Sequence, residues 1–204
     1  EKGEWELSLS THIDDLKGCG SDKAREALRK QLASDFSDDL KEQIGEFEHI
    51  GIKHIQDPKT FSVYTHQNHY VEQLHPINTA MLPTDEDLAI SGMAYTLFRS
   101  LLGALQSLLQ TRGDIVPYVG CLQRYAQVPT AKHVKMINRV LRWCKHNKTG
   151  ILYSFIPGKL AMAVIADSAY KCEPEDTDCL ALRGFIIALL GRSLDGSYIL
   201  HFLE

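Results

Sequence analysis

The chain has 204 residues, of which 44% are hydrophobic and 24% are charged, a composition typical of a globular protein. This composition excludes wholesale disorder, a collagen-like chain and a disulfide scaffold. No apolar run is long enough to cross a bilayer, and no apolar segment follows a basic start, so we expect neither a membrane span nor a signal peptide. The five cysteines form no Cys-x-x-Cys pair, which favours a reducing, intracellular setting without a zinc ribbon.

The net charge of -4 conceals a basic middle segment. Residues 115–166 contain eight lysines and arginines and no Asp or Glu, whereas the segments on both sides are acidic. A basic segment between acidic flanks predicts a polyanionic partner, and nucleic acid is the commonest partner of this kind.

The N-terminal region is predicted to be rich in strands. Polar and apolar residues alternate from Trp5 to Thr11, and a second short strand follows the pair Asp14-Asp15, so we expect a tight hairpin with both acids near its tip. Ser21 and Asp22 are typical caps for a helix that runs to about Phe36. Further strands are predicted over 46–55 and 61–65, joined by a turn at 57–58, and a short helix over 70–74.

A helical region is expected next, followed by more strands. Thr84 and Asp87 resemble a capping box for a helix that reaches about Gln110. Asp114 is a candidate cap for a helix that ends before 129, and Thr130 for one that reaches about 146. Four apolar segments then predict strands over 152–156, 160–166, 182–190 and 198–203.

The first candidate site is the acidic pair at the N-terminal hairpin. Adjacent carboxylates at a sharp bend offer the oxygen ligands that Mg²⁺ prefers, and two-metal nucleotidyl transfer needs such a cluster. The alternative is that Asp14 and Asp15 only solvate a turn, where Asp is common in any case.

The second candidate site is the helix that begins after Thr130. Its apolar residues Val134, Ile137, Leu141 and Cys144 fall on one face. Basic residues are expected on the opposite face: Lys132, Lys135, Arg139, Arg142 and Lys145. Such a row suits a phosphate backbone without reading bases, although a merely solvated lysine-rich face is the alternative.

A third candidate is Asp167, which directly follows an apolar strand. A carboxylate at this position can be the leading metal ligand of a nuclease, but acidic residues also end strands for no functional reason. The nine histidines have no cysteine or carboxylate spacing that completes a zinc site, so we expect surface or packing roles for them.

Several short segments match, in a fixed order, the motifs of one known family. They are the hairpin 10–16, the segment 49–52, the pair of segments 65–67 and 70–71, the stretch 95–115, the helix 129–143, and 167–170 with 182–185. Together they resemble the reverse transcriptase of copia-type retrotransposons, from the C-terminal part of its palm into its ribonuclease H domain. The chain departs from the family at His12, where Tyr is usual, and at His49, where Phe is usual.

The resemblance implies an α+β chain in three parts: a partial palm (1–82), a helical thumb (83–149) and the start of a ribonuclease H-like sheet (150–204). It implies RNA-directed DNA polymerisation, with Asp14 and Asp15 binding Mg²⁺ (or Mn²⁺), and Asp167 as the leading ribonuclease H carboxylate. Contacts to nucleic acid are expected from His12, Ile50, Gly51 and the basic row. The implied partners are an RNA/DNA primer–template duplex and a dNTP, in a cytoplasmic particle or the nucleus.

By the same resemblance, the third polymerase acid belongs before residue 1 and the other ribonuclease H acids after residue 204. The isolated chain is therefore expected to complete neither active site. The alternative from another class is a non-catalytic nucleic-acid-binding remnant, or a domesticated element, that uses only the basic helix.

Overall fold

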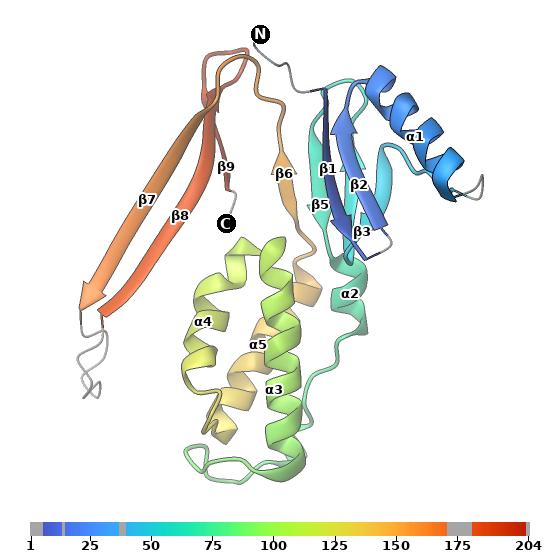
Figure 1. The fold of residues 1–204 in the computed structure, drawn as a ribbon. Helices are drawn as coiled ribbons and strands as arrows, with labels where there is room; N and C mark the ends of the chain where they lie inside the picture. The colour runs from blue at the N-terminus through green and yellow to red at the C-terminus, as the bar shows by residue number, and fades with distance from the viewer. Residues whose placement is uncertain (1–5, 14, 37–39, 171–180, 203–204) are drawn as a thin grey trace.

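The computed structural model describes residues 6–13, 15–36, 40–170 and 181–202. Figure 1 shows four parts: a hairpin with a helix, a small sheet, a helical unit and a third sheet, β7 to β9, that extends away as an arm. The architecture is therefore mixed α/β, with strands at both ends of the chain and helices in the middle. No helix in the described ranges is long and apolar enough to cross a membrane.

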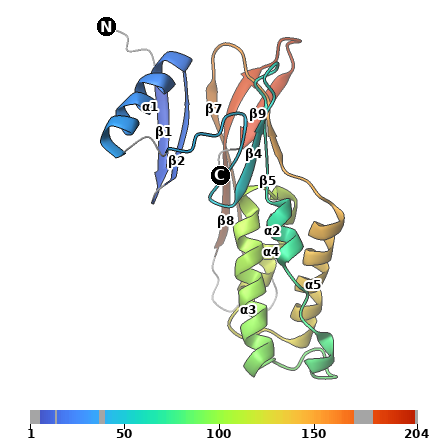
Figure 2. The same cartoon turned by 90° about the vertical axis from the view of Figure 1, so that its right-hand side faces the viewer.

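The first part is an antiparallel hairpin of β1 (Leu7–His12) and β2 (Asp15–Gly20), followed by α1 (Asp22–Phe36). These elements confirm the sequence prediction. The hydroxyl of Ser21 accepts a hydrogen bond from the backbone N–H of Ala24 at 3.2 Å, which caps the helix as expected. No residue of α1 is fully buried, so its apolar face is only partly covered. Figure 2 shows the hairpin and α1 together on one side of the neighbouring sheet.

The second part is a four-stranded antiparallel sheet in the order β3 (Glu46–His49), β4 (Ile52–Gln56), β5 (Val63–His66) and β6 (Ile151–Tyr153). The prediction of one continuous strand over 46–55 was wrong, because a two-residue turn at Ile50 and Gly51 divides it. Both turn residues have positive φ, 52° and 70°, as the favoured hairpin turns require. β6 pairs with β5, so the chain returns to this sheet after the helical unit.

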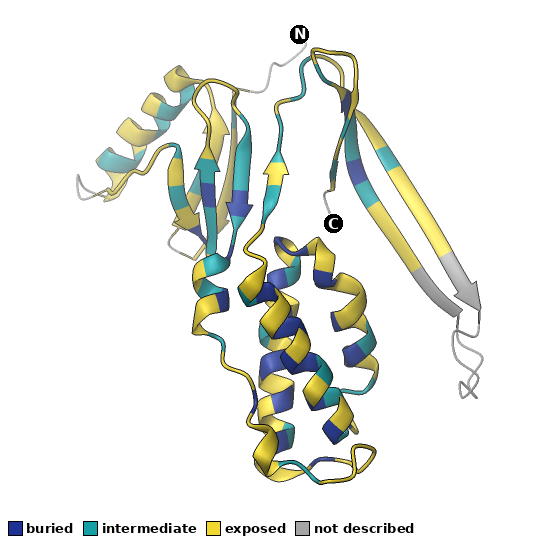
Figure 3. Cartoon of the chain, turned by 180° about the vertical axis from the view of Figure 1, so that it is seen from behind, coloured by how far each residue is buried: buried dark blue, intermediate teal, exposed yellow. Residues whose placement is uncertain are grey.

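The helical unit contains the main core of the described residues. After α2 (Asn68–Gln73), a short 3₁₀ turn η1 (Thr79–Met81) leads to α3 (Gly92–Ser107), α4 (Val116–Arg124) and α5 (Ala131–His146). Two further 3₁₀ turns, η2 (Leu108–Gln110) and η3 (Gly113–Ile115), link α3 to α4. Fully buried side chains from all three long helices meet here, among them Phe98, Leu105, Val119, Ile137 and Leu141. Figure 3 shows that the buried residues concentrate in this unit.

The predicted helix from Thr84 to Gln110 begins later than expected. α3 starts at Gly92, and the preceding residues instead form a turn over 85–88 and a single β-bridge between Ala89 and Thr130, beside the start of α5. The carbonyls of Glu86 and Leu88 accept hydrogen bonds from the backbone N–H groups of Lys132 and Ala131, at 2.9 and 3.3 Å. The first turn of a helix has no internal partners for these N–H groups. The turn over 85–88 supplies those partners for α5, and this use of its carbonyls competes with helix formation over 84–91.

The third sheet consists of β7 (Ala161–Tyr170), β8 (Ala181–Arg192) and β9 (Tyr198–Phe202). Its three strands confirm the last three strand predictions. Large apolar side chains are exposed on both faces: Met162, Val164 and Phe185 on one, and Ile165, Ile186 and Phe202 on the other. We call this three-stranded sheet the β7–β9 arm (Figure 1).

Candidate nucleic-acid interface

The acidic hairpin forms where the sequence predicted it. His12 pairs with Asp15, and Ile13, which follows His12, has a φ of 54° and is 93% exposed. Asp15 is exposed as the first residue of β2. Asp14, the other predicted metal ligand, lies outside the described residues.

A bond between side chains ties this hairpin to the neighbouring sheet. The ammonium of Lys17 donates to Nε2 of His54 at 2.8 Å, and Nδ1 of His54 donates to the carbonyl of Ile52 at 3.0 Å. An ammonium only donates and a carbonyl only accepts, so His54 is the neutral tautomer with its proton on Nδ1. Burial, and then the charge of Lys17, lowers the pKa of His54, which favours this neutral form.

The predicted metal ligands do not assemble into a cation site among the described residues. Over these residues, no group of three or more His, Cys, Asp or Glu side chains is arranged to hold a metal ion. Asp167 lies inside β7, opposite Gly184, and its exposed side chain belongs to the β7–β9 arm. Figure 1 shows this arm on the opposite side of the molecule from the β1–β2 hairpin. The described residues therefore do not by themselves complete a site for Mg²⁺.

The turn between β3 and β4 presents the next two predicted contact residues. Ile50 is 49% exposed at a positive φ, where a β-branched side chain is unusual, and Gly51 follows it. His49 is buried, and its Nε2 has no hydrogen-bond partner among the described residues. The apolar side chain of Ile50 is thus held out of the sheet at a cost in backbone strain.

Four of the five basic residues predicted on α5 are exposed, and the fifth, Lys145, is half-buried. Lys132, Lys135, Arg139 and Arg142 recur at intervals of three and four residues, which places them on one side of the helix. The apolar residues predicted for the opposite face, Val134, Ile137, Leu141 and Cys144, are fully buried. This confirms the predicted division of the helix into a core face and a basic face, except for Lys145.

Two lysines of the basic row, Lys135 and Lys145, interact with groups on neighbouring segments. Lys135 forms an ion pair with Glu86 at 2.6 Å, and the charges of Lys132 and Arg139 also help to lower the pKa of Glu86. Both partners of this pair are about half exposed, so the pair contributes little stability. Lys145 is half-buried and donates to the carbonyl of Glu72 at 3.2 Å. Glu86 therefore acts on three of the exposed cations, Lys132, Lys135 and Arg139, and these four groups together keep a net positive charge.

α5 is fixed in place at its start and at its middle. The backbone N–H of Thr130 donates to Nδ1 of His133 at 3.0 Å, an unusual capping box with His in place of Glu. Asn138, which is 5% exposed, bonds both backbone groups of Ile77, at 2.9 and 2.8 Å. The basic row is thus carried by a helix whose position is set by buried hydrogen bonds as well as by apolar packing.

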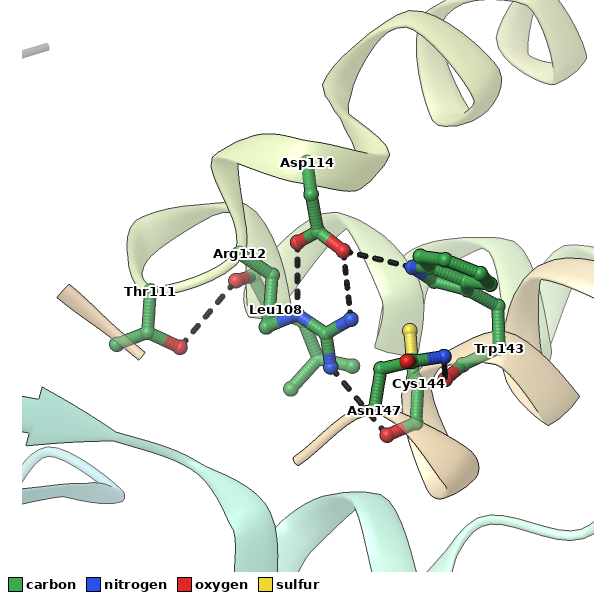
Figure 4. Close-up of polar contacts among 7 residues, drawn as sticks. All are labelled: Leu108, Thr111, Arg112, Asp114, Trp143, Cys144 and Asn147. Atoms are coloured by element: carbon green, nitrogen blue, oxygen red, sulfur yellow. Dashed lines mark hydrogen bonds and ion pairs between the residues drawn. The ribbon is translucent and has the colours of Figure 1, made fainter. Parts of the chain in front are cut away.

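Sequence reasoning missed a cluster at the end of α5. Arg112 is 1% exposed, and its guanidinium donates to both oxygens of Asp114, at 2.8 and 2.7 Å. The indole Nε1 of Trp143 donates to the same carboxylate at 2.8 Å (Figure 4). Asp114 therefore does not cap α4 as predicted, because its oxygens are occupied. An Arg-x-Asp spacing next to a core helix is the signal that points to such an ion pair.

Comparison with known proteins relates the chain to the Pol polyproteins of retrotransposons. It is similar to the Retrovirus-related Pol polyprotein from transposon RE1 of Arabidopsis thaliana, with 23% identity over 202 residues. The match covers 93% of this chain and 13% of that polyprotein. The similarity supports a retrotransposon origin and assigns the chain to no particular enzyme of the polyprotein. No family model matches the chain, and no solved structure matches it.

Proposed function

We propose that the helical unit binds the phosphate backbone of an RNA–DNA primer–template duplex, as the thumb of a retrotransposon reverse transcriptase. The observation that carries the proposal is the exposed row of Lys132, Lys135, Arg139 and Arg142 on a helix whose other face is buried. From Lys132 to Arg142 the row extends over about 15 Å of helix. Measured along the axis of a DNA duplex, at 3.4 Å per phosphate of one strand, this length corresponds to about four phosphates. Lysine and arginine contacts to phosphates give affinity without reading sequence, as a polymerase requires.

The finer proposal is RNA-directed DNA polymerisation, with Asp14 and Asp15 as ligands of Mg²⁺ (or Mn²⁺) and Asp167 as a ribonuclease H acid. The order of the motifs in the sequence supports it, as does the similarity to a retrotransposon Pol polyprotein. The hairpin also has the predicted form, with Asp15 exposed beside the turn. A bound Mg²⁺ would supply charge stabilisation for nucleotidyl transfer.

The basic row is tested by titrating a fluorescent RNA–DNA hybrid with the full chain at several salt concentrations. We expect the logarithm of the binding constant to fall linearly with the logarithm of the salt concentration. The double variant Arg139→Gln/Arg142→Gln removes two phosphate contacts, so the slope becomes shallower by about two. A matched control is Arg29→Gln/Lys30→Gln, which removes the same charge from α1. Equal effects of both pairs, or binding that does not depend on salt, would contradict the thumb proposal.

The polymerase proposal needs a separate test, because a non-catalytic nucleic-acid-binding remnant would also bind duplex. We expect Asp15→Asn to abolish primer extension in a polyprotein segment that contains this chain and the upstream palm. Duplex binding is expected to be unchanged in the same variant. Extension at the wild-type rate would refute the metal role of Asp15. A wild-type segment that binds duplex but extends no primer would favour the remnant.

A further inference from the structure

Trp143 is an exposed aromatic side chain with a fixed orientation. It is 53% exposed, yet its indole Nε1 is hydrogen-bonded to Oδ2 of Asp114 at 2.8 Å. Figure 4 shows the nitrogen edge of the ring directed at Asp114 and the rest of the ring directed away from it. The same carboxylate accepts hydrogen bonds from Nε and Nη2 of Arg112, and the side chain of Arg112 is almost fully buried. The ring is therefore held by a hydrogen bond that is anchored in the core.

The charges around Trp143 favour a polyanion at this ring. Arg139 lies four residues before Trp143 and is therefore its neighbour on the same side of α5. Arg142 is adjacent in sequence and exposed. The nearest described carboxylate in the hydrogen-bond network, Asp114, is neutralised by Arg112, and the Arg112 contact lowers the pKa of its carboxyl group. A phosphate beside the ring thus meets arginine charge without an uncompensated acid.

We propose that Trp143 is a stacking platform for an unpaired nucleobase, placed at the C-terminal end of the basic row. This proposal rests on the proposed function, because it takes the ligand of the row to be nucleic acid. A base inside a duplex has both of its faces covered by neighbouring bases, so along the duplex a flat indole can stack only on an unpaired base. Stacking of bases on aromatic side chains tolerates any sequence, since every base has a π-face. Trp143 would therefore hold the single strand that leaves the duplex bound along Lys132 to Arg142.

The experiment uses the full chain with Trp5→Phe, which makes Trp143 the only tryptophan. The probes are a blunt RNA–DNA hybrid and the same hybrid with a short unpaired tail. We expect the tailed hybrid to quench the emission of Trp143, and the blunt hybrid to bind with little quenching. Trp143→Ala is expected to lower affinity for the tailed hybrid by roughly 5- to 100-fold, with little change for the blunt one. Trp143→Phe is expected to restore part of the difference.

The matched control is Tyr118→Ala, which removes another aromatic side chain, 60% exposed, from α4. It is expected to change the affinity for neither hybrid. Circular dichroism and unfolding midpoints establish that each variant is folded. If wild type and Trp143→Ala prefer the tailed hybrid equally, or if neither prefers it, the stacking proposal is wrong while the basic row still stands. If neither hybrid binds in a salt-dependent way, the proposed function fails as well.

Discussion

The ammonium of Lys17 in β2 donates a hydrogen bond to Nε2 of His54 in β4, at 2.8 Å. Lys17 is two residues from Asp15, and His54 is four residues from Ile50, so the bond links the hairpin of the acidic pair to the hairpin of the β3–β4 turn. These are the two segments that the family resemblance assigns to the catalytic acids and to contacts with nucleic acid. Their relative position depends in part on His54 remaining neutral.

We expect the stability of the chain to fall as the pH is lowered through about 6.5, the ordinary pKa of histidine. Burial and the charge of Lys17 lower the pKa of His54 in the folded state, so unfolding is accompanied by proton uptake in this range. His49 also contributes to the lowering of the pKa of His54, and the hydrogen bond to the carbonyl of Ile52 acts in the opposite direction. Urea denaturation at pH 8 and pH 5.5 measures the difference.

The contribution of His54 is separated by His54→Gln, whose side-chain oxygen can accept from Lys17 but does not titrate. This variant is expected to lose less stability between pH 8 and pH 5.5 than the wild type. His75→Gln, which changes an exposed histidine, serves as the control and is expected to behave like the wild type. An equal loss in wild type and His54→Gln would show that this contact does not couple stability to pH.

Glu86→Gln is expected to increase the affinity for an RNA–DNA hybrid. Glu86 holds Lys135 in an ion pair at 2.6 Å, and a phosphate must displace it to use that lysine. Removal of its charge makes Lys135 available for one more phosphate contact. The slope of the logarithm of the binding constant against the logarithm of the salt concentration is then expected to become steeper by about one. Glu26→Gln on α1 is the control, because it removes an exposed acid at a distance from α5. A weaker complex with Glu86→Gln would exclude Lys135 from the binding surface.

Replacing either partner of the ion pair between Arg112 and Asp114 is expected to lower the free energy of unfolding, but by different amounts. Asp114→Asn leaves the buried guanidinium of Arg112 without a counter-charge, so we expect a loss of about 3–5 kcal/mol in the free energy of unfolding. Arg112→Met leaves Asp114, which is 35% exposed and can be hydrated, so the loss is expected to be smaller. Urea denaturation of both single variants and the double variant gives the coupling energy. Equal losses from the two single variants would contradict this assignment of burial.

Ile50→Asn is expected to stabilise the β3–β4 hairpin by about 1 kcal/mol, because Asn tolerates the positive φ that strains Ile50. If the exposed Ile50 side chain contacts the nucleic acid, as the resemblance implies, the same change weakens duplex binding. Opposite changes in stability and binding would indicate that strain is retained for function. Unchanged binding would show that Ile50 has no contact with the ligand.

Helices with a clear apolar face and a polar cap could be predicted from sequence almost to the residue. α1 and α5 follow the expected bounds, since Ser21, Thr130 and the periodic apolar residues mark them unambiguously. The helix expected from Thr84 was misplaced, because the backbone of 86–90 is used by the start of α5, a contact between segments far apart in sequence.

The candidate site was predicted in part. The basic row followed from helical spacing alone, and its exposure is confirmed for four of its five residues, whereas Lys145 is half-buried. The orientation of Trp143 depends on Asp114, 29 positions away in the chain, and on the burial of Arg112. Local periodicity carries no information about such long-range contacts, so the cluster became visible only in three dimensions.

The β7–β9 arm has a practical consequence for any study of the protein in solution. Apolar side chains such as Val164 and Ile165 are exposed to solvent on opposite faces of this three-stranded sheet. A sheet with both faces apolar and exposed promotes self-association of the protein. Binding measurements are therefore best made at low protein concentration, with light scattering monitored throughout, so that aggregation is not mistaken for ligand binding.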